Sequence, residues 1–294
     1  VVGHLNPDTD SICSAIAYAN LKNHLPGASE KIYEPRRAGQ INEETQHVLK
    51  SFGLKPPKLL SNLRVQVKDV DLRKIEGVKT SVPIKRAWEI MKEEKMKTLP
   101  VTRDSKLEGL ITVGDIATSY MDVHDSTVLS EARTQYRNIS NAVDGRVLQG
   151  NHHGYFQEGK VAIAASGVAQ MKALIEKDDL VIMGNVEELE LCAVDINVSC
   201  MVICRAEKVE KEILKKAAEK EIVVIATPHD VFTTARLINQ SIPVKYFMTK
   251  EHLVSFHMDE YVDDVREIMT KKKFRDFPIL DAVGNFEGFI SRRR

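Results

Sequence analysis

Leu107-Glu108-Gly109-Leu110-Ile111-Thr112 returns later in the chain as Phe286-Glu287-Gly288-Phe289-Ile290-Ser291, and this repeat decides the domain organisation. The triplet Glu89-Ile90-Met91 precedes the first copy, and Glu267-Ile268-Met269 precedes the second. The triplets are 178 residues apart and the later stretches 179, so the second copy holds one extra residue in its turn. A motif that recurs in the same order and spacing predicts two copies of one structural unit.

The first copy indicates the elements of that unit. A helix is expected around residues 88–91, followed by a strand at 99–101 and an apolar strand from Leu107 to Val113. A further helix is expected to open at Asp115. The residues from Pro56-Pro57 to Asp122 therefore form one folded segment, with the boundary to the preceding sequence at the two prolines.

The segment between the copies, roughly 126–242, has a different pattern. Short apolar runs bounded by turn or helical signals predict the buried strands of an α/β domain. These runs are 161–164, 180–183, 201–203 and 222–225. Helices are expected around 168–176, 209–220 and 231–239. Cys200 and Cys204 lie within an apolar run and are expected to be buried rather than to bind zinc.

Two motifs of the insert contain residue types found in metal-binding or catalytic sites, but a structural role explains each of them. Asn151-His152-His153-Gly154 is expected to be an exposed loop, since no Cys or carboxylate lies at ligand spacing. Thr227-Pro228-His229-Asp230 is a helix start, with Thr227 or Asp230 as the cap, and a catalytic role for His229 is disfavoured.

The chain opens with Val1-Val2-Gly3-His4-Leu5-Asn6-Pro7-Asp8-Thr9-Asp10-Ser11. We expect a strand at Val1-Val2, a helix with Ile12, Ala15, Ile16 and Ala19 on its apolar face, a strand at Ile32-Tyr33 and a helix over 43–52. This order predicts a parallel α/β unit. Imidazole and carboxylate groups gathered where a strand ends and a helix begins suit hard divalent cations acting on phosphate. Helix capping is the alternative role for Asp8 and Asp10.

The composition restricts the class of protein. The chain has 294 residues, of which 43% are hydrophobic and 29% charged, as expected of a globular protein with several domains. The 42 basic and 42 acidic residues cancel, which argues against a nucleic-acid or membrane-surface partner. No apolar run approaches the roughly 20 residues of a membrane helix, and four cysteines make no disulfide framework. We expect a cytoplasmic protein and, because the chain begins without Met, a fragment of a longer one.

Gly3-His4-x-Asn6-Pro7-Asp8-Thr9-Asp10-Ser11 resembles the first motif of the DHH phosphoesterases, most closely of the family II inorganic pyrophosphatases. The stretch Arg37-Ala38-Gly39-x-x-Asn42-x-Glu44-Thr45 is similar to that family as well. The resemblance implies that His4, Asp8 and Asp10 are metal ligands, for manganese or cobalt with magnesium alongside. No catalytic residue is separable from these ligands. The family's later Asp-His-Asn and Asp-His-His motifs, with the other metal ligands, are absent.

The two copies resemble CBS domains, and the insert resembles a DRTGG domain, although the literal tetrad of that name is absent. The resemblance implies an α/β multidomain fold in which two βαββα CBS repeats flank an α/β DRTGG domain. The expected bounds are 1–57 for the N-terminal piece of a parallel-sheet DHH domain, 58–125 and 243–294 for the CBS repeats, and 126–242 for the DRTGG domain. The remaining DHH and DHHA2 parts would lie outside this chain.

CBS pairs bind adenine nucleotides, which implies a set of regulatory site residues. Thr112 would meet a phosphate and Asp115 the ribose diol, as short polar groups at a strand end and one helical turn on. In the second repeat Ser291 matches Thr112, but Arg294 stands where an acidic residue is expected. The further candidates are Lys97, Thr98, Pro100, Lys273, Phe274, Arg275 and Phe277. A solvated surface is the alternative for the basic residues, and core packing is the alternative for Phe274 and Phe277.

This domain order is similar to the nucleotide-regulated subclass of family II pyrophosphatases. It implies hydrolysis of inorganic pyrophosphate, inhibition by AMP and ADP, activation by ATP or diadenosine polyphosphates, and a homodimer assembled through the CBS and DRTGG domains. As a mainly regulatory stretch, the chain is expected to be inactive alone. Two alternatives remain open: a stand-alone nucleotide-binding module, and a DHH phosphoesterase acting on oligonucleotides or cyclic dinucleotides. The neutral charge weighs against the latter.

Overall fold

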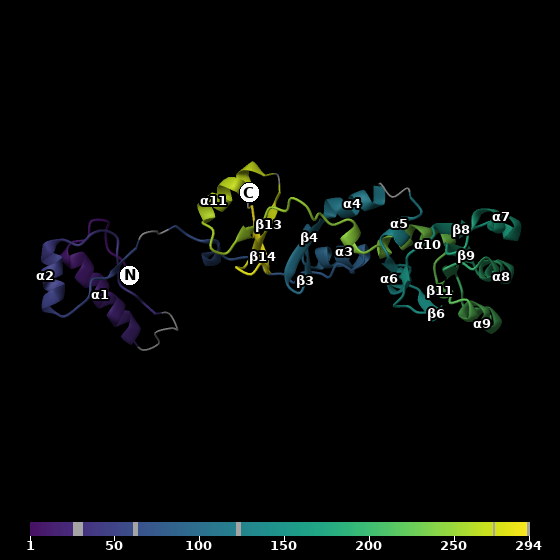
Figure 1. The fold of residues 1–294 in the computed structure, drawn as a ribbon, viewed down its shortest axis with the longest axis horizontal. Coiled ribbons are helices and arrows are strands. Elements are labelled where there is room, and N and C mark those ends of the chain that lie inside the picture. Colours follow the sequence, from purple (N-terminus) through teal and green to yellow (C-terminus); the bar gives the residue numbers. More distant parts are fainter. Residues whose placement is uncertain (26–31, 61–63, 122–124, 273, 293–294) are drawn as a thin grey trace. The chain divides into compact units, whose positions relative to one another are not determined.

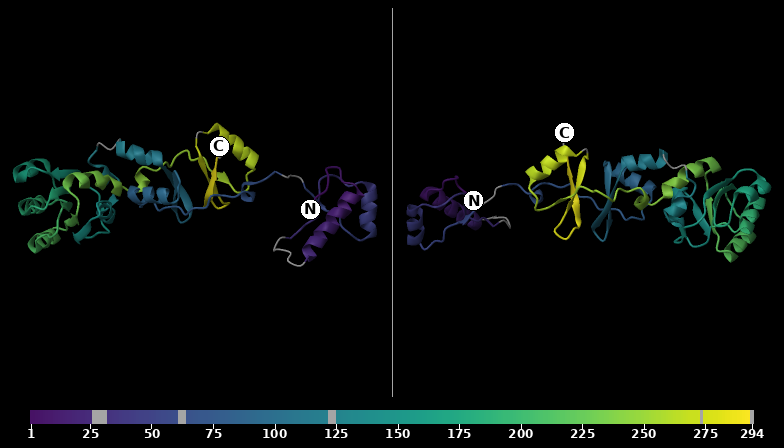
Figure 2. Two further views of the ribbon diagram at one scale, coloured as in Figure 1. Left: turned by 180° about the vertical axis from the view of Figure 1, so that it is seen from behind. Right: turned by 45° about the horizontal axis from the view of Figure 1, so that its top comes forward.

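The computed structural model describes residues 1–25, 32–60, 64–121, 125–272 and 274–292. The chain divides into two compact units (Figures 1 and 2). The first comprises residues 1–70 with 261–266, and the second comprises residues 71–260 with 267–294. Within the described part, no helix combines the length and apolar character that crossing a membrane requires.

The first unit is built on two helices and a short parallel strand pair. Helix α1 (Thr9–His24) and helix α2 (Glu43–Ser51) are each capped by a side chain, that of Asp8 and that of Asn42. Strand β1 (Arg36–Arg37) pairs in parallel with β2 (Lys58–Leu59), and the 3₁₀ turn η1 (Val67–Asp69) follows. The expected apolar face of α1 is confirmed, with Ile12, Ala15 and Ala19 buried.

Two strand predictions in this unit were wrong. Val1-Val2 is not a strand, although the Val1 carbonyl accepts a hydrogen bond of 2.8 Å from the Arg36 backbone N–H. The strand expected at Ile32-Tyr33 lies instead at Arg36–Arg37. The strand at Ile32 was predicted from the apolar character of this residue. In the structure Ile32 is 84% exposed, and no neighbouring strand covers it among the described residues.

The two repeats in the sequence are confirmed as repeats of structure. The first repeat contains α3 (Ile84–Glu93), β3 (Thr98–Arg103), β4 (Lys106–Thr112) and α4 (Val113–Met121). The second contains β12 (Phe256–His257), α11 (Val262–Lys271), β13 (Asp276–Leu280) and β14 (Phe286–Ser291). Helices α3 and α11 begin 178 residues apart. Each repeat folds its last two strands into an antiparallel hairpin, and Figure 1 shows the hairpins next to each other.

Each hairpin is completed by the segment that leads into the other repeat. Leu110 on β4 exchanges two backbone hydrogen bonds, of 3.0 and 2.9 Å, with Thr249. Phe289 on β14 exchanges two, of 3.0 and 2.9 Å, with Arg73. The preceding glycines allow this approach, since a Cβ on Gly109 would lie 2.8 Å from the Thr249 carbonyl oxygen and one on Gly288 2.9 Å from that of Arg73.

The insert is an α/β sandwich. Its sheet has the order β6-β11-β10-β9-β8. Strands β8 (Val161–Ala164), β9 (Leu180–Gly184), β10 (Cys200–Cys204) and β11 (Val223–Thr227) are parallel, and β6 (Arg146–Gln149) is antiparallel. The four apolar runs and the burial of Cys200 and Cys204 are thereby confirmed. Strand β6 was not predicted, because Val147 and Leu148 are its only apolar residues and do not make an apolar run.

Helices cover both faces of this sheet (Figures 1 and 2). Helices α7 (Gly167–Leu174), α8 (Glu187–Ile196) and α9 (Lys211–Glu219) pack on one face. On the other lie α5 (Val128–Glu131), α6 (Tyr136–Ala142), α10 (Val231–Leu237) and the 3₁₀ turn η2 (Ile238–Ser241). The short pair β5 (Thr134–Gln135) and β7 (Tyr155–Phe156) and the turn η3 (Val244–Tyr246) complete the insert and its exit. Successive residues of β9, β10 and β11 alternate between the two cores, so these central strands are buried on both faces, whereas Ile163 on the edge strand β8 is 47% exposed.

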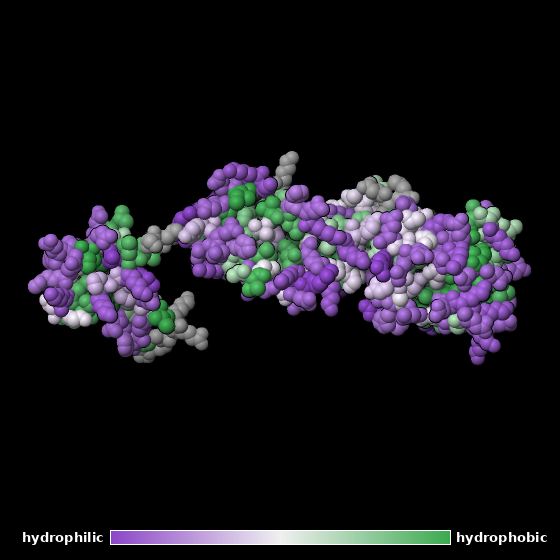
Figure 3. Space-filling model, viewed as in Figure 1, coloured by the Kyte–Doolittle hydropathy of each residue, from purple (hydrophilic) through white to green (hydrophobic). Residues whose placement is uncertain are grey.

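The motifs at 151–154 and 227–230 form an exposed loop and a helix start, as predicted. His152 and His153 lie in the turn between β6 and β7, where both are exposed. Asp230 caps α10 by accepting a hydrogen bond of 2.8 Å from the Thr233 backbone N–H. The Thr227 hydroxyl instead donates to the Val143 carbonyl oxygen, at 2.6 Å. On the face shown in Figure 3, hydrophilic residues predominate and hydrophobic ones reach the surface in places.

Glu190 on α8 offers a test of this core. Its side chain is 2% exposed, and Oε1 has no hydrogen-bond partner among the described residues. Burial raises the pKa of the carboxyl to about 7, and the nearby charges of Glu187 and Glu210 add to the effect. Because this pKa is higher in the folded than in the unfolded chain, folding stability should fall as the pH rises from about 4.5 to about 7.

Glu190→Gln should remove this pH-dependent loss, which for the wild type amounts to up to about 3 kcal/mol above pH 7. Urea unfolding between pH 4.5 and 8.5 measures it. The matched control is Glu188→Gln, an exposed residue of the same helix, which should keep the wild-type slope. Parallel stability curves for wild type and Glu190→Gln would contradict the prediction.

Candidate functional site

Two clefts lie where the paired repeats meet. The first, called cleft 1, is a hollow of about 180 Å3 beside the end of β4 and the start of β13. Its walls combine polar groups at the strand ends with apolar side chains. They are Thr98, Leu110, Thr112, Thr249, His252, Leu253, Val254, Phe274, Arg275, Asp276 and Phe277. The site is thus assembled from both repeats and from the segment that leads into the second.

The other, called cleft 2, has a volume of about 940 Å3 and lies beside the end of β14. Five basic and two acidic residues are among its walls, which favours an anionic ligand. The walls are Asp71, Leu72, Arg73, Lys95, Met96, Lys97, Arg275, Asp276, Phe289, Ile290, Ser291 and Arg292. Cleft 2 is the counterpart of cleft 1, with the segment that leads into the first repeat in place of residues 249–254.

Asp276 separates the two clefts and binds a hydroxyl in each repeat. Its Oδ2 accepts a hydrogen bond of 3.3 Å from the Thr98 hydroxyl, and its Oδ1 accepts one of 2.6 Å from the Ser291 hydroxyl. Thr98 and Asp276 are 178 residues apart and occupy the same position in their repeats. Arg275 lines both clefts as well. A ligand in either cleft would therefore contact residues that also border the other.

Thr112 and Asp115 bind each other at the junction of β4 and α4. The Asp115 carboxylate accepts hydrogen bonds from the Thr112 backbone N–H at 2.7 Å and from its hydroxyl at 2.8 Å. The Asp115 backbone N–H donates to the Thr112 hydroxyl at 3.2 Å. Thr112 lines cleft 1, and Asp115 lies one helical turn behind it. The carboxylate thus fixes the position of the hydroxyl that would meet a phosphate.

The two candidate aromatic residues differ in exposure. Phe277 is 0% exposed and packs against Phe256, with the ring centroids 5.5 Å apart. Phe274 is 57% exposed, and its ring meets Phe277 edge-on at 6.2 Å. Phe274 therefore has a free face on which a planar base could stack, whereas Phe277 supports it from the core.

The structure brings most of the predicted nucleotide residues to the clefts. Thr98, Thr112, Phe274, Arg275 and Phe277 line cleft 1, and Lys97, Arg275 and Ser291 line cleft 2. Within the described residues, Pro100 lines neither cleft, because it is buried in β3, where its carbonyl accepts a hydrogen bond from the Val78 backbone N–H. Lys273 and Arg294 lie outside the described residues.

Sequence reasoning missed the residues of the lead-in segments. Asp71–Arg73 and His252–Val254 carry no motif, and they reach the clefts only by pairing with the opposite hairpin. Asp276 could have been found, since the repeat offset places it opposite Thr98. Lys95 and Arg292 lie close in sequence to the predicted residues Lys97 and Ser291, but no motif in the sequence includes them.

His4, Asp8 and Asp10 surround the start of α1. His4 Nε2 lies 3.4 Å from Asp8 Oδ1, and both side chains are more than half exposed. The Ser11 backbone N–H donates to Asp8 Oδ1 at 2.9 Å, so the capping role holds. That hydrogen bond lowers the pKa of Asp8, and the charge of His4 adds to the effect. Asp10 accepts a hydrogen bond of 3.4 Å from the Ser14 hydroxyl.

These groups suit a divalent cation in chemistry, but they do not make a complete site. Ionised carboxylates and an imidazole are ligands for manganese or cobalt. Next to them, the buried Ser11 hydroxyl has no hydrogen-bond partner among the described residues. Among all the residues that the structure describes, no group of three or more His, Cys, Asp or Glu side chains is close enough to hold a metal ion. The metal-ligand role of all three residues stays a prediction.

Comparison with known proteins identifies the domains and their combination. The DRTGG domain profile matches residues 138–241, and the CBS domain profile matches residues 67–122 and 244–294. The cobalt-dependent inorganic pyrophosphatase of Clostridium perfringens is 34% identical over 293 residues, which is 99% of this chain and 53% of that protein. The probable manganese-dependent inorganic pyrophosphatase of Thermotoga maritima is 30% identical over 292 residues, with the same coverage of 99% and 53%. The chain thus spans about half the length of these relatives.

A solved structure matches the larger part of the chain. It contains the CBS and DRTGG domains of the regulatory region of Clostridium perfringens pyrophosphatase in complex with an activator, diadenosine tetraphosphate. It is 32% identical, has a TM-score of 0.75, and covers 78% of this chain and 100% of its own. The expected fold of two CBS repeats flanking an α/β DRTGG domain is confirmed. The chain therefore belongs to the family of inorganic pyrophosphatases whose regulatory region combines CBS and DRTGG domains.

Proposed function

We propose that this chain carries the adenine-nucleotide-binding regulatory region, and part of the metal site, of a cytoplasmic inorganic pyrophosphatase. The observation that carries the proposal is the pair of related clefts joined by Arg275 and Asp276. The related regulatory region of known structure is complexed with diadenosine tetraphosphate. The four cysteines, all of them described, are free, which suits a reducing compartment.

The two clefts suit different parts of a nucleotide. Cleft 1 offers Leu253, Val254 and the free face of Phe274 to an adenine ring. Cleft 2 offers Arg73, Lys97 and Arg292 to phosphates. Because the clefts share a wall, a diadenosine polyphosphate would reach both, whereas AMP or ADP would occupy one at a time. This difference supplies a reason for mono- and dinucleotide effectors to act in opposite directions.

Arg275→Gln should weaken binding of AMP and of diadenosine tetraphosphate about tenfold, because a charged phosphate contact is lost. Isothermal titration measures both affinities. Arg103→Gln is the matched control, since Arg103 is an exposed end residue of β3 that pairs with Glu108 and lines neither cleft. Absence of nucleotide binding to the wild-type chain would refute the regulatory proposal.

The metal proposal assigns His4, Asp8 and Asp10 to a divalent cation, Mn2+ or Co2+ with Mg2+ alongside. When bound, such a cation lowers the pKa of a coordinated water and neutralises charge on phosphate. The chain's own residues contribute two things. The Asp8 carboxylate caps the start of α1 and remains accessible to a cation, and the His4 imidazole lies next to it. We propose that the remaining ligands and the pyrophosphate-binding residues come from the other half of the longer protein, so this chain alone should not hydrolyse pyrophosphate.

Asp8→Asn separates the two roles of Asp8. Asparagine caps helices as well as aspartate, so the thermal midpoint of the first unit should hardly change, whereas the lost charge should weaken Mn2+ binding at least tenfold. Asp8→Ala should lose the cap as well as the metal affinity. Calorimetric Mn2+ titration and circular dichroism measure the two effects. Equal Mn2+ affinity for wild type and Asp8→Asn would remove Asp8 from the ligand set.

We also propose a homodimer in which α3 and α4 of the first repeat meet a second copy. A groove of about 330 Å3 on these helices is lined by Ile84, Trp88, Val113, Ile116, Ala117 and Tyr120, with Lys85 and Gln240 at its rim. Trp88 is 42% and Tyr120 51% exposed, and with the other apolar residues of the groove they form one contiguous apolar surface. Burying them against the same face of a partner would remove that apolar surface from water.

Trp88→Glu should convert the dimer to a monomer, because a charge in an apolar interface is left unpaired. Light scattering after gel filtration measures the mass. Val283→Glu is the control, since Val283 is 73% exposed in the β13–β14 turn, away from this groove. A wild-type chain that is monomeric at high micromolar concentration would contradict the proposal.

A further inference from the structure

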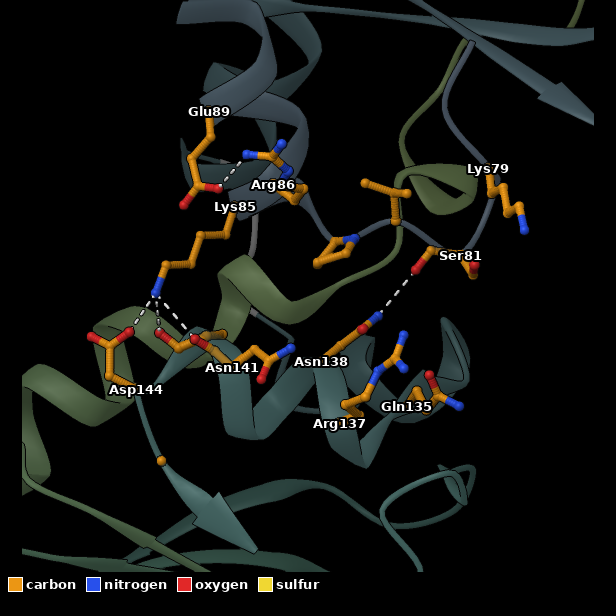
Figure 4. A pocket seen from close by; sticks show the side chains of 14 residues that line it. Lys79, Ser81, Lys85, Arg86, Glu89, Gln135, Arg137, Asn138, Asn141 and Asp144 are labelled. Carbon is orange, nitrogen blue, oxygen red and sulfur yellow. Dashed lines mark hydrogen bonds and ion pairs between the residues drawn. The ribbon is translucent and has the colours of Figure 1, made fainter. Parts of the chain in front are cut away.

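A cavity of about 620 Å3 lies between the first repeat and the insert, away from both clefts (Figure 4). One wall is α3 with the segment before it, and the other is α6 with the residues that follow it. A volume of this size is typical of small-molecule sites. The cavity belongs entirely to the second unit, so its two walls are placed by one folded body.

Both acidic residues of the cavity wall are already paired. Lys85 Nζ lies 2.8 Å from Asp144 Oδ1 and also donates to the Asn141 and Ala142 carbonyl oxygens, at 3.1 and 3.3 Å. His229 Nε2 lies 3.0 Å from the other Asp144 oxygen. The hydrogen bond from Lys85 and then that from His229 lower the pKa of Asp144, so it remains ionised and committed to these partners. Glu89 is likewise held by Arg86, at 3.2 Å.

Two cationic residues of the wall have no such partner. Within the described ranges, neither Lys79 nor Arg137 has a carboxylate within ion-pair distance. They lie on opposite walls, Lys79 before α3 and Arg137 on α6, as Figure 4 shows. The cavity therefore carries an excess of about two positive charges that the protein itself does not neutralise.

The rest of the wall is rich in neutral hydrogen-bonding groups. Ser81 lies on the wall before α3, and Gln135, Asn138 and Asn141 lie on the opposite wall, in α6 and the residue before it (Figure 4). Asn138 is 5% exposed and donates to the Ser81 carbonyl oxygen at 3.1 Å, which ties the two walls together. No aromatic side chain is among the described residues of the wall, in contrast to cleft 1 with Phe274 and Phe277. The cavity has charge and polarity for phosphate but no platform for a base.

We propose that this cavity binds a small phosphate-bearing anion that lacks a nucleobase, held between Lys79 and Arg137. The Arg137 guanidinium and the Lys79 ammonium supply charged hydrogen-bond donors on the two walls, and phosphate oxygens accept such hydrogen bonds. Such a ligand bridges the first repeat and the insert. Its binding adds contacts to the junction that Lys85 and Asp144 already form, and so reduces local opening of the two walls. The proposal is independent of nucleotide binding in the clefts.

The test uses the full chain in metal-free buffer with a chelator and saturating diadenosine tetraphosphate, so that both clefts are filled and the His4 segment holds no cation. Isothermal titrations with inorganic phosphate, pyrophosphate and glycerol phosphate form three arms. Binding to one site per chain is expected, and the tightest arm identifies whether a free anion or a phosphomonoester is preferred. Lys79→Gln/Arg137→Gln should weaken that binding at least tenfold.

The matched control is Lys211→Gln/Lys215→Gln, which removes the same charge from exposed positions of α9. It should bind like the wild type. Hydrogen exchange gives a second readout: the anion should slow exchange in residues 79–89 and 135–145 of the wild type and not of the double variant. No binding at millimolar anion, or equal affinities for the double variant and the control, would overturn the proposal. AMP titration of the double variant, expected to be unchanged, separates this outcome from failure of the nucleotide clefts.

Discussion

The exchange of lead-in segments between the two repeats is the constraint on which the regulatory unit depends. Neither hairpin is complete alone, because β4 pairs with Thr249 and β14 pairs with Arg73. The exchange is possible only where backbone can approach backbone closely, and Gly109 and Gly288 provide that space. The two repeats must therefore fold as one body. The glycines of the repeated motif serve this packing rather than a ligand.

The clefts follow from that exchange. Each is bounded by the end of one hairpin and the lead-in segment of the other repeat, so their walls exist only in the assembled pair. Asp276 then couples them, since its two oxygens bind hydroxyls on either side. Filling one cleft necessarily acts on residues that border the other. Coupling between sites of this kind requires only a shared wall whose geometry both ligands influence.

The insert is joined to the first repeat by a shared apolar core and, at the cavity between them, by polar contacts as well. Lys85 closes the end of α6 and pairs with Asp144, and Asn138 bonds back to the segment before α3. Because close-packed apolar side chains resist changes of angle, the shared core holds the first repeat and the insert in one arrangement, and the polar contacts add to it. A stiff junction of this kind would carry a change of position in the first repeat directly to the insert.

The sequence alone determined the repeats, the four buried strands of the insert and the helix starts. These features follow from local patterns: a recurring motif, apolar runs of strand length, and side chains such as Asp8 and Asp230 that cap the backbone next to them. The same local patterns placed Thr112, Lys97 and Arg275 at strand ends, where the clefts lie. Local apolar character failed at Val1-Val2 and Ile32, since a strand needs a neighbour to pair with.

Only the tertiary structure decided which residues share a cleft. Residues 71–73 and 249–254 carry no signal, and their role arises from pairing with a hairpin far away in sequence. The separation of Phe277 from Phe274, one buried and one exposed, likewise depends on how Phe256 packs. The cavity between Lys79 and Arg137 joins residues of two domains. Local sequence specifies backbone preference and face, whereas a site is a set of distances that only long-range packing establishes.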